Sequence, residues 1–229
     1  MTTPATLGVV IVAAGSGVRF GDAGKALASL AGRPLLSWSL ALFDSLPETH
    51  EIVVVAGSHT LDSCTALLTT ASLAHVTVVE GGATRTASML AGLAALSDQV
   101  SHVAVHDAAR PLVTVALAQR VIAAAVATGA AVPVIPVRDT LHVVSAEGRI
   151  AATPDRATLR AAQTPQVARR DWLLAAGRSA AGSTDEGGML HAAGYPVALV
   201  EGDPDNLKIT WPQDLALAEA LLAARKVAR

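Results

Sequence analysis

Apolar runs that are typical of β-strands alternate with helix-like segments along most of this chain of 229 residues. We predict strands at residues 7–12, 52–56, 76–79, 103–106, 130–136 and 197–200. We predict helices at residues 34–46, 59–70, from Thr84 or Thr86 onward, 115–128, 169–178, 183–191 and 211–225. Strands that alternate with helices indicate a largely parallel sheet covered on both faces. The sequence therefore predicts an α/β fold, with a Rossmann-like open, mostly parallel twisted sheet and helices on both faces.

The loop after the first predicted strand combines glycines with two cations. Gly15 and Gly17 can adopt positive φ and have no Cβ, so neighbouring backbone N–H groups can turn together toward an anion. Arg19 offers a planar fork for two phosphate oxygens, and Lys25 offers a compact ammonium. A glycine-rich turn without a ligand is the alternative, but two cations in one short loop weigh against it in a chain with 17 Lys and Arg residues. We interpret residues 13–25 as a phosphate-binding loop.

This loop matches neither of two familiar glycine motifs. The dinucleotide fingerprint requires a third glycine where Phe20 stands. The P-loop requires Ser or Thr after its Gly-Lys pair, whereas Gly24 and Lys25 are followed by Ala26. Neither a dinucleotide site nor a P-loop is therefore predicted.

Three of the predicted strands end in polar loops, at residues 13–25, 81–88 and 107–110. The carboxyl ends of strands in an open parallel sheet lie along one edge, and ligands bind at that edge. The convergence predicts a site for a nucleotide or a phosphorylated small molecule.

The composition restricts the partners and the location that we expect. The formal net charge is −2, whereas binders of nucleic acid or of membrane surfaces normally carry a basic excess. Residues 1–6 lack a basic stretch followed by an apolar core, and no window reaches about 18 uninterrupted apolar residues. The single cysteine, Cys64, has no partner for a disulfide within the chain. We expect a cytoplasmic enzyme that binds neither nucleic acid nor membrane.

Several polar residues follow the fourth predicted strand. Asp107 is a candidate ligand for Mg²⁺ or for a ribose hydroxyl, with a helix cap as the alternative. Arg110 is a candidate ligand for a second phosphate, although an Arg beside a Pro in a surface loop is usually just solvated. His106 ends an apolar strand, so we interpret it as a packed core residue. Ser16 lies in Gly-Ser-Gly and not in the G-x-S-x-G context of a nucleophile elbow, so hydrolysis through a covalent intermediate is disfavoured.

The α/β alternation stops after residues 130–136. Residues 138–159 are too polar for a central strand, and residues 147–149 form a predicted turn between two short extended segments. We predict a projecting hairpin arm, with an exposed surface hairpin as the alternative. The chain as a whole is predicted to be a single domain, 1–229.

Seven short motifs occur along the chain in a characteristic order and spacing. They are AAGSGVR at 13–19 with Lys25, GG at 81–82 with Arg85 and Ser88, DAARP at 107–111, PVRDT at 136–140, TPQ at 164–166, TDE at 184–186 and DNLK at 205–208. Each is weak when taken singly. Together they cover essentially the whole chain, which resembles the 2-C-methyl-D-erythritol 4-phosphate cytidylyltransferases of the non-mevalonate isoprenoid pathway.

The resemblance implies that a phosphate oxygen of methylerythritol phosphate attacks the α-phosphorus of CTP and releases pyrophosphate. Mg²⁺ or another divalent cation would bridge the triphosphate. A phosphate monoester with a second pKa of about 6 is mostly dianionic at neutral pH, so it needs no general base. The protein has to supply charge neutralisation and in-line positioning.

The resemblance also implies roles for single residues. The implied catalytic cations are Arg19, Lys25, Arg156 and Lys208. The implied CTP-binding residues are Ala13, Ala14, Gly15, Ser16, Gly17, Gly81, Gly82, Arg85, Ser88, Asp107 and Ala108, with Asp107 also as the metal ligand. The implied residues around the methylerythritol phosphate are Arg110, Thr140, Thr164 and Thr184.

The resemblance further implies a homodimer with shared active sites. Residues 137–159 would form a dimerisation arm, so that Arg156 of one protomer enters the pocket of its partner. Ala83 is a departure, because family members often have an acidic residue after the glycine pair. We therefore expect the backbone of residues 81–82 and Ser88 to recognise cytosine.

Two other functions are compatible with these motifs. A cytidylyltransferase for another polyol phosphate, such as ribitol 5-phosphate, would have a similar nucleotide half, although Arg156 and Lys208 favour methylerythritol phosphate. A regulatory module that binds CTP without turnover is the second alternative. Two cations at the expected α-phosphate position argue against it, because a sensor gains nothing from stabilising a transition state.

Overall fold

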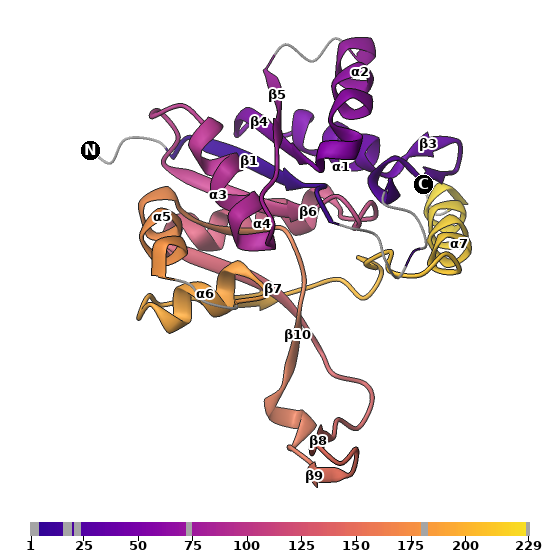
Figure 1. The fold of residues 1–229 in the computed structure, drawn as a ribbon, viewed down its shortest axis with the longest axis vertical. Coiled ribbons are helices and arrows are strands. Elements are labelled where there is room, and N and C mark those ends of the chain that lie inside the picture. Colours follow the sequence, from indigo (N-terminus) through magenta and orange to yellow (C-terminus); the bar gives the residue numbers. More distant parts are fainter. Residues whose placement is uncertain (1–4, 16–19, 21–23, 72–74, 180–182, 228–229) are drawn as a thin grey trace.

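The computed structural model describes residues 5–15, 20, 24–71, 75–179 and 183–227. The strands of its main sheet are β1 (Leu7–Val12), β4 (Thr49–Ala56), β5 (Val76–Glu80), β6 (His102–Asp107), β7 (Ala130–Pro136), β10 (Arg160–Ala162), β11 (Gln166–Arg169) and β12 (Ala198–Glu201). In this described part they lie in the order β10-β7-β11-β6-β1-β4-β5, and β12 lies beside β7 (Figure 1). All six predicted strands are present, with bounds that differ by at most a few residues.

The centre of the sheet is parallel, as predicted. Strand β1 pairs in parallel with both β4 and β6, and β5 continues the sheet beyond β4. Our sequence reading missed β10 and β11, which are antiparallel, and β11 lies between β6 and β7. Strand β11 has four residues of which the first three are buried, so no polar–apolar alternation marks it in the sequence. The sheet is therefore mixed. Its parallel strands β1, β5 and β6 end at the three polar loops that were predicted to converge.

Helices cover both faces of this sheet. One face lies under α1 (Leu35–Asp44), α2 (Leu61–Ala71) and α4 (Val115–Thr128), and the other lies under α3 (Arg85–Ala95), α5 (Arg170–Ser179) and α6 (Glu186–Ala192). Successive residues of a strand point to opposite faces, so β1 contributes to two cores. Val9 and Ile11 pack in the core that contains Phe43, whereas Val10 packs in the core that contains Leu93. The two apolar layers hold the strand ends in fixed positions.

A third, smaller core joins the segment around Leu30 to the C-terminal part of the chain. It lies where α7 (Asp214–Val227) packs near the hairpin of β2 (Ser29–Leu30) and β3 (Arg33–Pro34). Leu30 and Ile209 are fully buried there. This packing brings the segment before α7 next to the 3₁₀ helix η2 (Lys25–Leu27), where Lys25 Nζ donates to the carbonyl oxygen of Ile209 at 3.1 Å. Within the described ranges, none of the helices combines the length and the apolar character that crossing a bilayer requires.

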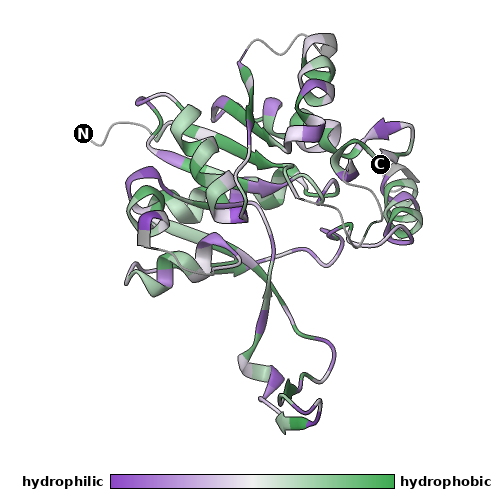
Figure 2. Cartoon of the chain, in the orientation of Figure 1, coloured by the Kyte–Doolittle hydropathy of each residue, from purple (hydrophilic) through white to green (hydrophobic). Residues whose placement is uncertain are grey.

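The segment between β7 and β10 leaves the sheet as a long arm (Figure 1). Its tip is a small antiparallel hairpin of β8 (Val143–Val144) and β9 (Ile150–Ala152), and the 3₁₀ helix η4 (Arg156–Thr158) precedes β10. The two strands of the tip are apolar (Figure 2), yet their side chains are exposed, with 65% of Val144 and 64% of Ile150 accessible. The predicted projection is therefore confirmed.

Candidate active site

A cavity of about 350 Å³ lies at the carboxyl ends of β1, β5 and β6. All three polar loops that were predicted to converge contribute to it, so the convergence is confirmed. Its lining consists of Val12, Ala13, Ala14, Gly15, Lys25, Ala26, Gly82, Ala83, Thr84, Arg85, Ser88, Asp107, Ala108, Ala109 and Lys208.

Two glycines in the loop after β5 allow close contacts, Gly81 with the loop after β1 and with α3, and Gly82 with α3. A Cβ on Gly81 would lie 2.6 Å from the Cβ of Ala14 and 2.8 Å from the Oγ of Ser88. A Cβ on Gly82 would lie 2.5 Å from the Cβ of Ala87. Real Cβ atoms do not come this close to other heavy atoms, so larger residues would push the loops apart. The Oγ of Ser88 donates to the carbonyl oxygen of Gly82 at 3.3 Å, which ties the loop to the first turns of α3.

The beginning of α3 is fixed by its own cap. Thr84 Oγ1 accepts the N–H of Ala87 at 3.0 Å, which confirms one of the two predicted caps. Deeper in the helix, a Cβ on Gly92 would lie 2.4 Å from Val10 Cγ1, so the glycine lets α3 pack tightly on β1. Cap and close packing together set the position of Arg85, the first residue of the helix.

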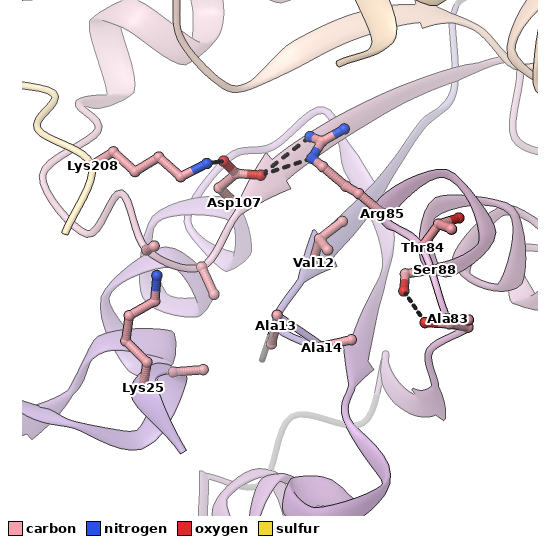
Figure 3. A pocket seen from close by; sticks show the side chains of 15 residues that line it. Val12, Ala13, Ala14, Lys25, Ala83, Thr84, Arg85, Ser88, Asp107 and Lys208 are labelled. Carbon is pink, nitrogen blue, oxygen red and sulfur yellow. Dashed lines mark hydrogen bonds and ion pairs between the residues drawn. The ribbon is translucent and has the colours of Figure 1, made fainter. Parts of the chain in front are cut away.

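Asp107 is the one carboxylate among the described residues that line the cavity, and two cations reach it from different segments (Figure 3). Arg85 Nη2 lies 3.2 Å from Oδ1, and Lys208 Nζ lies 2.6 Å from Oδ2. Thr164 Oγ1 accepts the N–H of Asp107 at 3.1 Å. Burial raises the pKa of Asp107, but the attraction of Lys208 and Arg85 outweighs burial and lowers the pKa well below its ordinary value. The carboxylate is therefore ionised at neutral pH.

Arg85 has a second acidic partner, Glu186, which our sequence reading did not assign to the site. Its oxygens Oε1 and Oε2 lie 2.5 Å from Nη1 and 3.0 Å from Nη2 of Arg85. Burial lowers the pKa of Arg85, but attraction to Glu186 and Asp107 raises it above its ordinary value. Burial raises the pKa of Glu186 more than Arg85 lowers it. The TDE motif at 184–186 contained this residue, but an acid in the first turn of a helix is also common for purely local reasons.

Two of the predicted catalytic cations line the cavity, and a third lies outside the described residues. Lys25 and Lys208 both line the cavity, although 182 residues separate them in the chain, and Figure 3 shows them entering from two different segments. Arg19, Ser16 and Gly17 lie outside the described residues. Their expected contacts with phosphate stay predictions from the sequence.

Two predicted substrate residues serve as internal braces in this structure. Arg110 donates to the carbonyl oxygens of Asn206 at 2.7 Å and Ala162 at 3.3 Å, so it links the segments on either side and is not simply solvated. Thr164 is buried, and its hydroxyl contacts His106 Nδ1 at 3.1 Å in addition to the Asp107 N–H. Neither side chain lines the cavity in the described part of the chain. Their contact with a substrate stays a prediction.

The other predicted substrate residues and the predicted catalytic Arg156 lie on the arm or outside the sheet. Thr140 is exposed on the arm, and Arg156 Nη1 donates to the carbonyl oxygen of Arg138 on the opposite side of the arm at 2.9 Å. Thr184 is exposed just before α6. Among the described residues of a single chain, these three do not meet Lys25 in the cavity lining.

His106 is a core residue, as predicted. It is fully buried and packs edge-on against Phe43. Burial lowers its pKa to about 4, so the ring is neutral at physiological pH. It therefore fills the core beneath the cavity and offers no exposed base.

Comparison with known proteins identifies relatives of this chain. The family model described as "IspD: 2-C-methyl-D-erythritol 4-phosphate cytidylyltransferase" matches residues 7–224. The chain is 45% identical over 231 residues to the bifunctional enzyme IspD/IspF of Bradyrhizobium sp. (strain ORS 278), a match that covers 98% of this chain and 58% of that enzyme. It is also 45% identical to the bifunctional enzyme IspD/IspF of Rhodopseudomonas palustris (strain HaA2), over 98% of this chain and 57% of that enzyme. The chain thus spans less than two thirds of the length of these curated relatives.

Solved structures with the same fold include two enzymes of matching length. The 2-C-methyl-D-erythritol 4-phosphate cytidylyltransferase of Thermus thermophilus is 37% identical with a TM-score of 0.75, over 93% of this chain and 98% of that one. The 4-diphosphocytidyl-2C-methyl-D-erythritol synthase of Anaerococcus prevotii is 26% identical with a TM-score of 0.83, over 96% of this chain and 99% of that one. The predicted Rossmann-like class is therefore confirmed.

We expect Asp107→Asn to lower the free energy of unfolding at pH 7 by about 3 kcal/mol, because it leaves two cations without their shared carboxylate. The folded-state pKa of Asp107 lies below the unfolded value of about 3.9, so this contribution is present above about pH 4 and is lost as the pH falls further. Urea unfolding of wild type and variant at pH 7 and pH 3 measures it. Asp44→Asn, at an exposed pair with His75, is the control and should cost little. A loss of equal size at both pH values would contradict the ion-pair explanation.

Proposed function

Because this chain belongs to the 2-C-methyl-D-erythritol 4-phosphate cytidylyltransferase family, we propose that it transfers CMP from CTP to 2-C-methyl-D-erythritol 4-phosphate. The products are 4-diphosphocytidyl-2-C-methyl-D-erythritol and pyrophosphate, which makes the chain a nucleotidyltransferase of isoprenoid biosynthesis acting in the cytoplasm. The observation that carries the proposal is the meeting of Lys25, Lys208 and Asp107 in one cavity at the strand ends.

The reaction requires charge and position more than acid–base chemistry. The attacking oxygen belongs to a phosphate monoester, which is mostly dianionic at neutral pH because its second pKa is about 6. Lys25 and Lys208, with Arg19 from the glycine loop, neutralise the charge that develops on the α-phosphate as pyrophosphate leaves. His106 is neutral and buried below the cavity, so it takes no part in proton transfer.

A divalent cation fits this cavity as a partner of the nucleotide. Within the described residues, no group of three or more His, Cys, Asp or Glu side chains could enclose a metal ion. Mg²⁺ in nucleotide sites is usually held by one or two carboxylates together with substrate phosphates, and Asp107 supplies one ionised carboxylate to the cavity. When bound, Mg²⁺ would neutralise part of the triphosphate charge. Asp107 would hold the ion and the ribose, and Lys208 would add its charge beside them.

We propose that cytosine is recognised by the backbone of Gly81 and Gly82 and by Ser88. Ala83 follows the glycine pair and offers no side-chain acceptor to the exocyclic amine. Ser88 is 2% exposed, and its hydroxyl is oriented by the carbonyl oxygen of Gly82. Backbone carbonyl and N–H groups held in fixed positions can distinguish the hydrogen-bond donors of a base from its acceptors, so a carboxylate is not needed.

The arm suggests a homodimer with shared active sites. Its exposed apolar side chains are Leu141, Val143, Val144 and Ile150, which a second protomer would cover. In a two-fold arrangement each arm reaches the other protomer reciprocally. Arg156 and Thr140 of one protomer would then approach the polyol phosphate at the cavity of its partner. In support, neither residue is among the described residues that line the cavity of its own chain.

Two alternatives are tested by one assay. Release of pyrophosphate from CTP in the presence of a polyol phosphate separates an enzyme from a module that only binds CTP. The same assay with 2-C-methyl-D-erythritol 4-phosphate and with ribitol 5-phosphate ranks the acceptors. We expect release to depend on the acceptor and to be fastest with the methylerythritol phosphate. No release with any acceptor would refute the proposed function.

We predict that Lys25→Ala lowers kcat about 100-fold or more and weakens CTP binding much less, because its contact strengthens as charge develops. Arg19→Ala should behave in the same way. Steady-state kinetics together with direct measurement of CTP binding separates the two effects. Arg120→Ala, which removes an exposed cation on α4, is the control and should leave both unchanged. A raised KM with unchanged kcat would rule out this role for Lys25.

We predict that CTP is preferred over UTP by about tenfold or more in kcat/KM, since each mismatched hydrogen bond at a buried rim costs about 1–3 kcal/mol. Ser88→Ala should reduce this preference more than it reduces the overall rate. Initial rates with both nucleotides at limiting concentrations give the ratio. Equal kcat/KM values for CTP and UTP in the wild type would contradict the proposed recognition of cytosine by Gly81, Gly82 and Ser88.

Mixing two inactive variants tests the shared sites. After dissociation and random reassociation of Lys25→Ala and Arg156→Ala protomers, half of the dimers are mixed, and each contains one site with both residues intact. We expect about one quarter of the wild-type activity to return. Mixing Lys25→Ala with Lys208→Ala is the control: both residues line the cavity of their own protomer, so each site of a mixed dimer lacks one of them and no activity should return. No recovery with Arg156→Ala despite demonstrated subunit exchange would mean that the arm acts within its own protomer.

A further inference from the structure

Glu186 is a buried carboxylate that no step of the proposed reaction uses. It is 3% exposed, and both of its oxygens contact Arg85, at 2.5 Å and 3.0 Å. Within the described part of the chain it does not line the cavity. Burying an ionised carboxylate costs free energy unless a cation pairs with it. The role of Glu186 is therefore sought in its pairing with Arg85.

Arg85 lies between two acids and uses two edges of its guanidinium. Nη1 and Nη2 face Glu186, whereas Nε and Nη2 face Oδ1 of Asp107 at 3.4 Å and 3.2 Å. The planar fork cannot rotate without breaking contacts on both sides. Lys208 takes the other oxygen of Asp107 at 2.6 Å. Two cations and two carboxylates therefore balance one another at the edge of the cavity.

The position of Glu186 is set by the middle of the sheet. Gln166 on β11 donates through Nε2 to Asp185 Oδ2 at 2.9 Å and accepts the N–H of Gly187 through Oε1 at 2.7 Å. Asp185 in turn caps α6 by accepting the N–H of Gly188 at 3.0 Å. The residues on both sides of Glu186 are thus anchored to a central strand.

We infer that Glu186 is a positioning residue for nucleotide binding, which rests on the proposed function. It holds the guanidinium of Arg85 on the side away from Asp107, so that Arg85 contacts Asp107 at Oδ1 alone, through Nε and Nη2, while Asp107 still lines the cavity. Without Glu186, the guanidinium has Asp107 as its one remaining carboxylate partner among these contacts and is drawn further onto it. The carboxylate is then less available to the ribose and Mg²⁺ of bound CTP.

Calorimetric titration of CTP with Mg²⁺, in the absence of a polyol phosphate, tests this inference without turnover. We expect Glu186→Gln to weaken CTP binding about tenfold, the lower end of the range for residues that orient a metal or ligand contact. In a background of Arg85→Met the same change should have almost no further effect, because Glu186 acts through Arg85. Glu186→Asp keeps the charge on a shorter side chain and should be intermediate.

A structural role alone predicts a different pattern. Met189→Ala, at a buried position of α6 outside these contacts, should lower the thermal stability and leave the dissociation constant unchanged. Unfolding reduces the number of binding sites per chain, whereas loss of positioning weakens each remaining site, and the titration reports both quantities.

Three results would overturn the inference. If wild type binds CTP and Glu186→Gln binds it equally well, Glu186 has no positioning role, and the proposed function stands. If Glu186→Gln raises the dissociation constant of CTP by the same factor in the wild-type and the Arg85→Met backgrounds, Glu186 does not act through Arg85. If wild type binds no CTP, both the inference and the proposed function fail.

Discussion

The pairing of one carboxylate, Asp107, with cations from two other segments is the interaction on which the geometry of the cavity depends. Arg85 begins α3, Lys208 precedes α7, and Asp107 ends β6. A carboxylate at this depth would cost several kcal/mol if it were left alone, so pairing with cations is a condition for burying it. The same pairing keeps the carboxylate ionised, and an ionised carboxylate is what a ribose or Mg²⁺ requires. One set of contacts therefore serves both the fold and the proposed chemistry.

The cations reach the cavity through packing that lies outside it. The net charge of the chain is −2, so an anionic ligand must be attracted by a local field and not by the protein as a whole. The small core around Leu30 and Ile209 holds the segment before α7 against η2, and this contact brings Lys25 and Lys208 to one cavity. In the proposed reaction the protein contributes positioned charge, because a phosphate monoester is already a competent nucleophile at neutral pH.

Much of this arrangement could be predicted from local sequence patterns, and the missing part depends on tertiary contacts. The predicted bounds of the helix Val115–Thr128 agree with the structure, in which Thr114 caps the helix and Gly129, at φ +95°, ends it. Strand β11 has no alternation, and the role of Glu186 arises because Gln166 on that strand anchors α6, which no local pattern encodes. Thr164, expected at the substrate, is buried and accepts the N–H of Asp107, a contact that its motif does not indicate. A motif identifies residues that matter, but whether they touch a ligand or support its contacts depends on packing.

In the proposed reaction, CMP is transferred in one in-line step, by positioned charge and without a nucleophile from the protein. The stereochemical course at the α-phosphorus distinguishes one displacement from two. CTP that carries sulfur in place of one α-oxygen, in a known configuration, would be converted with the polyol phosphate, and the configuration of the product would be determined. A single displacement predicts inversion. Retention would contradict this mechanism, because it requires two displacements through a covalent nucleotidyl–protein intermediate.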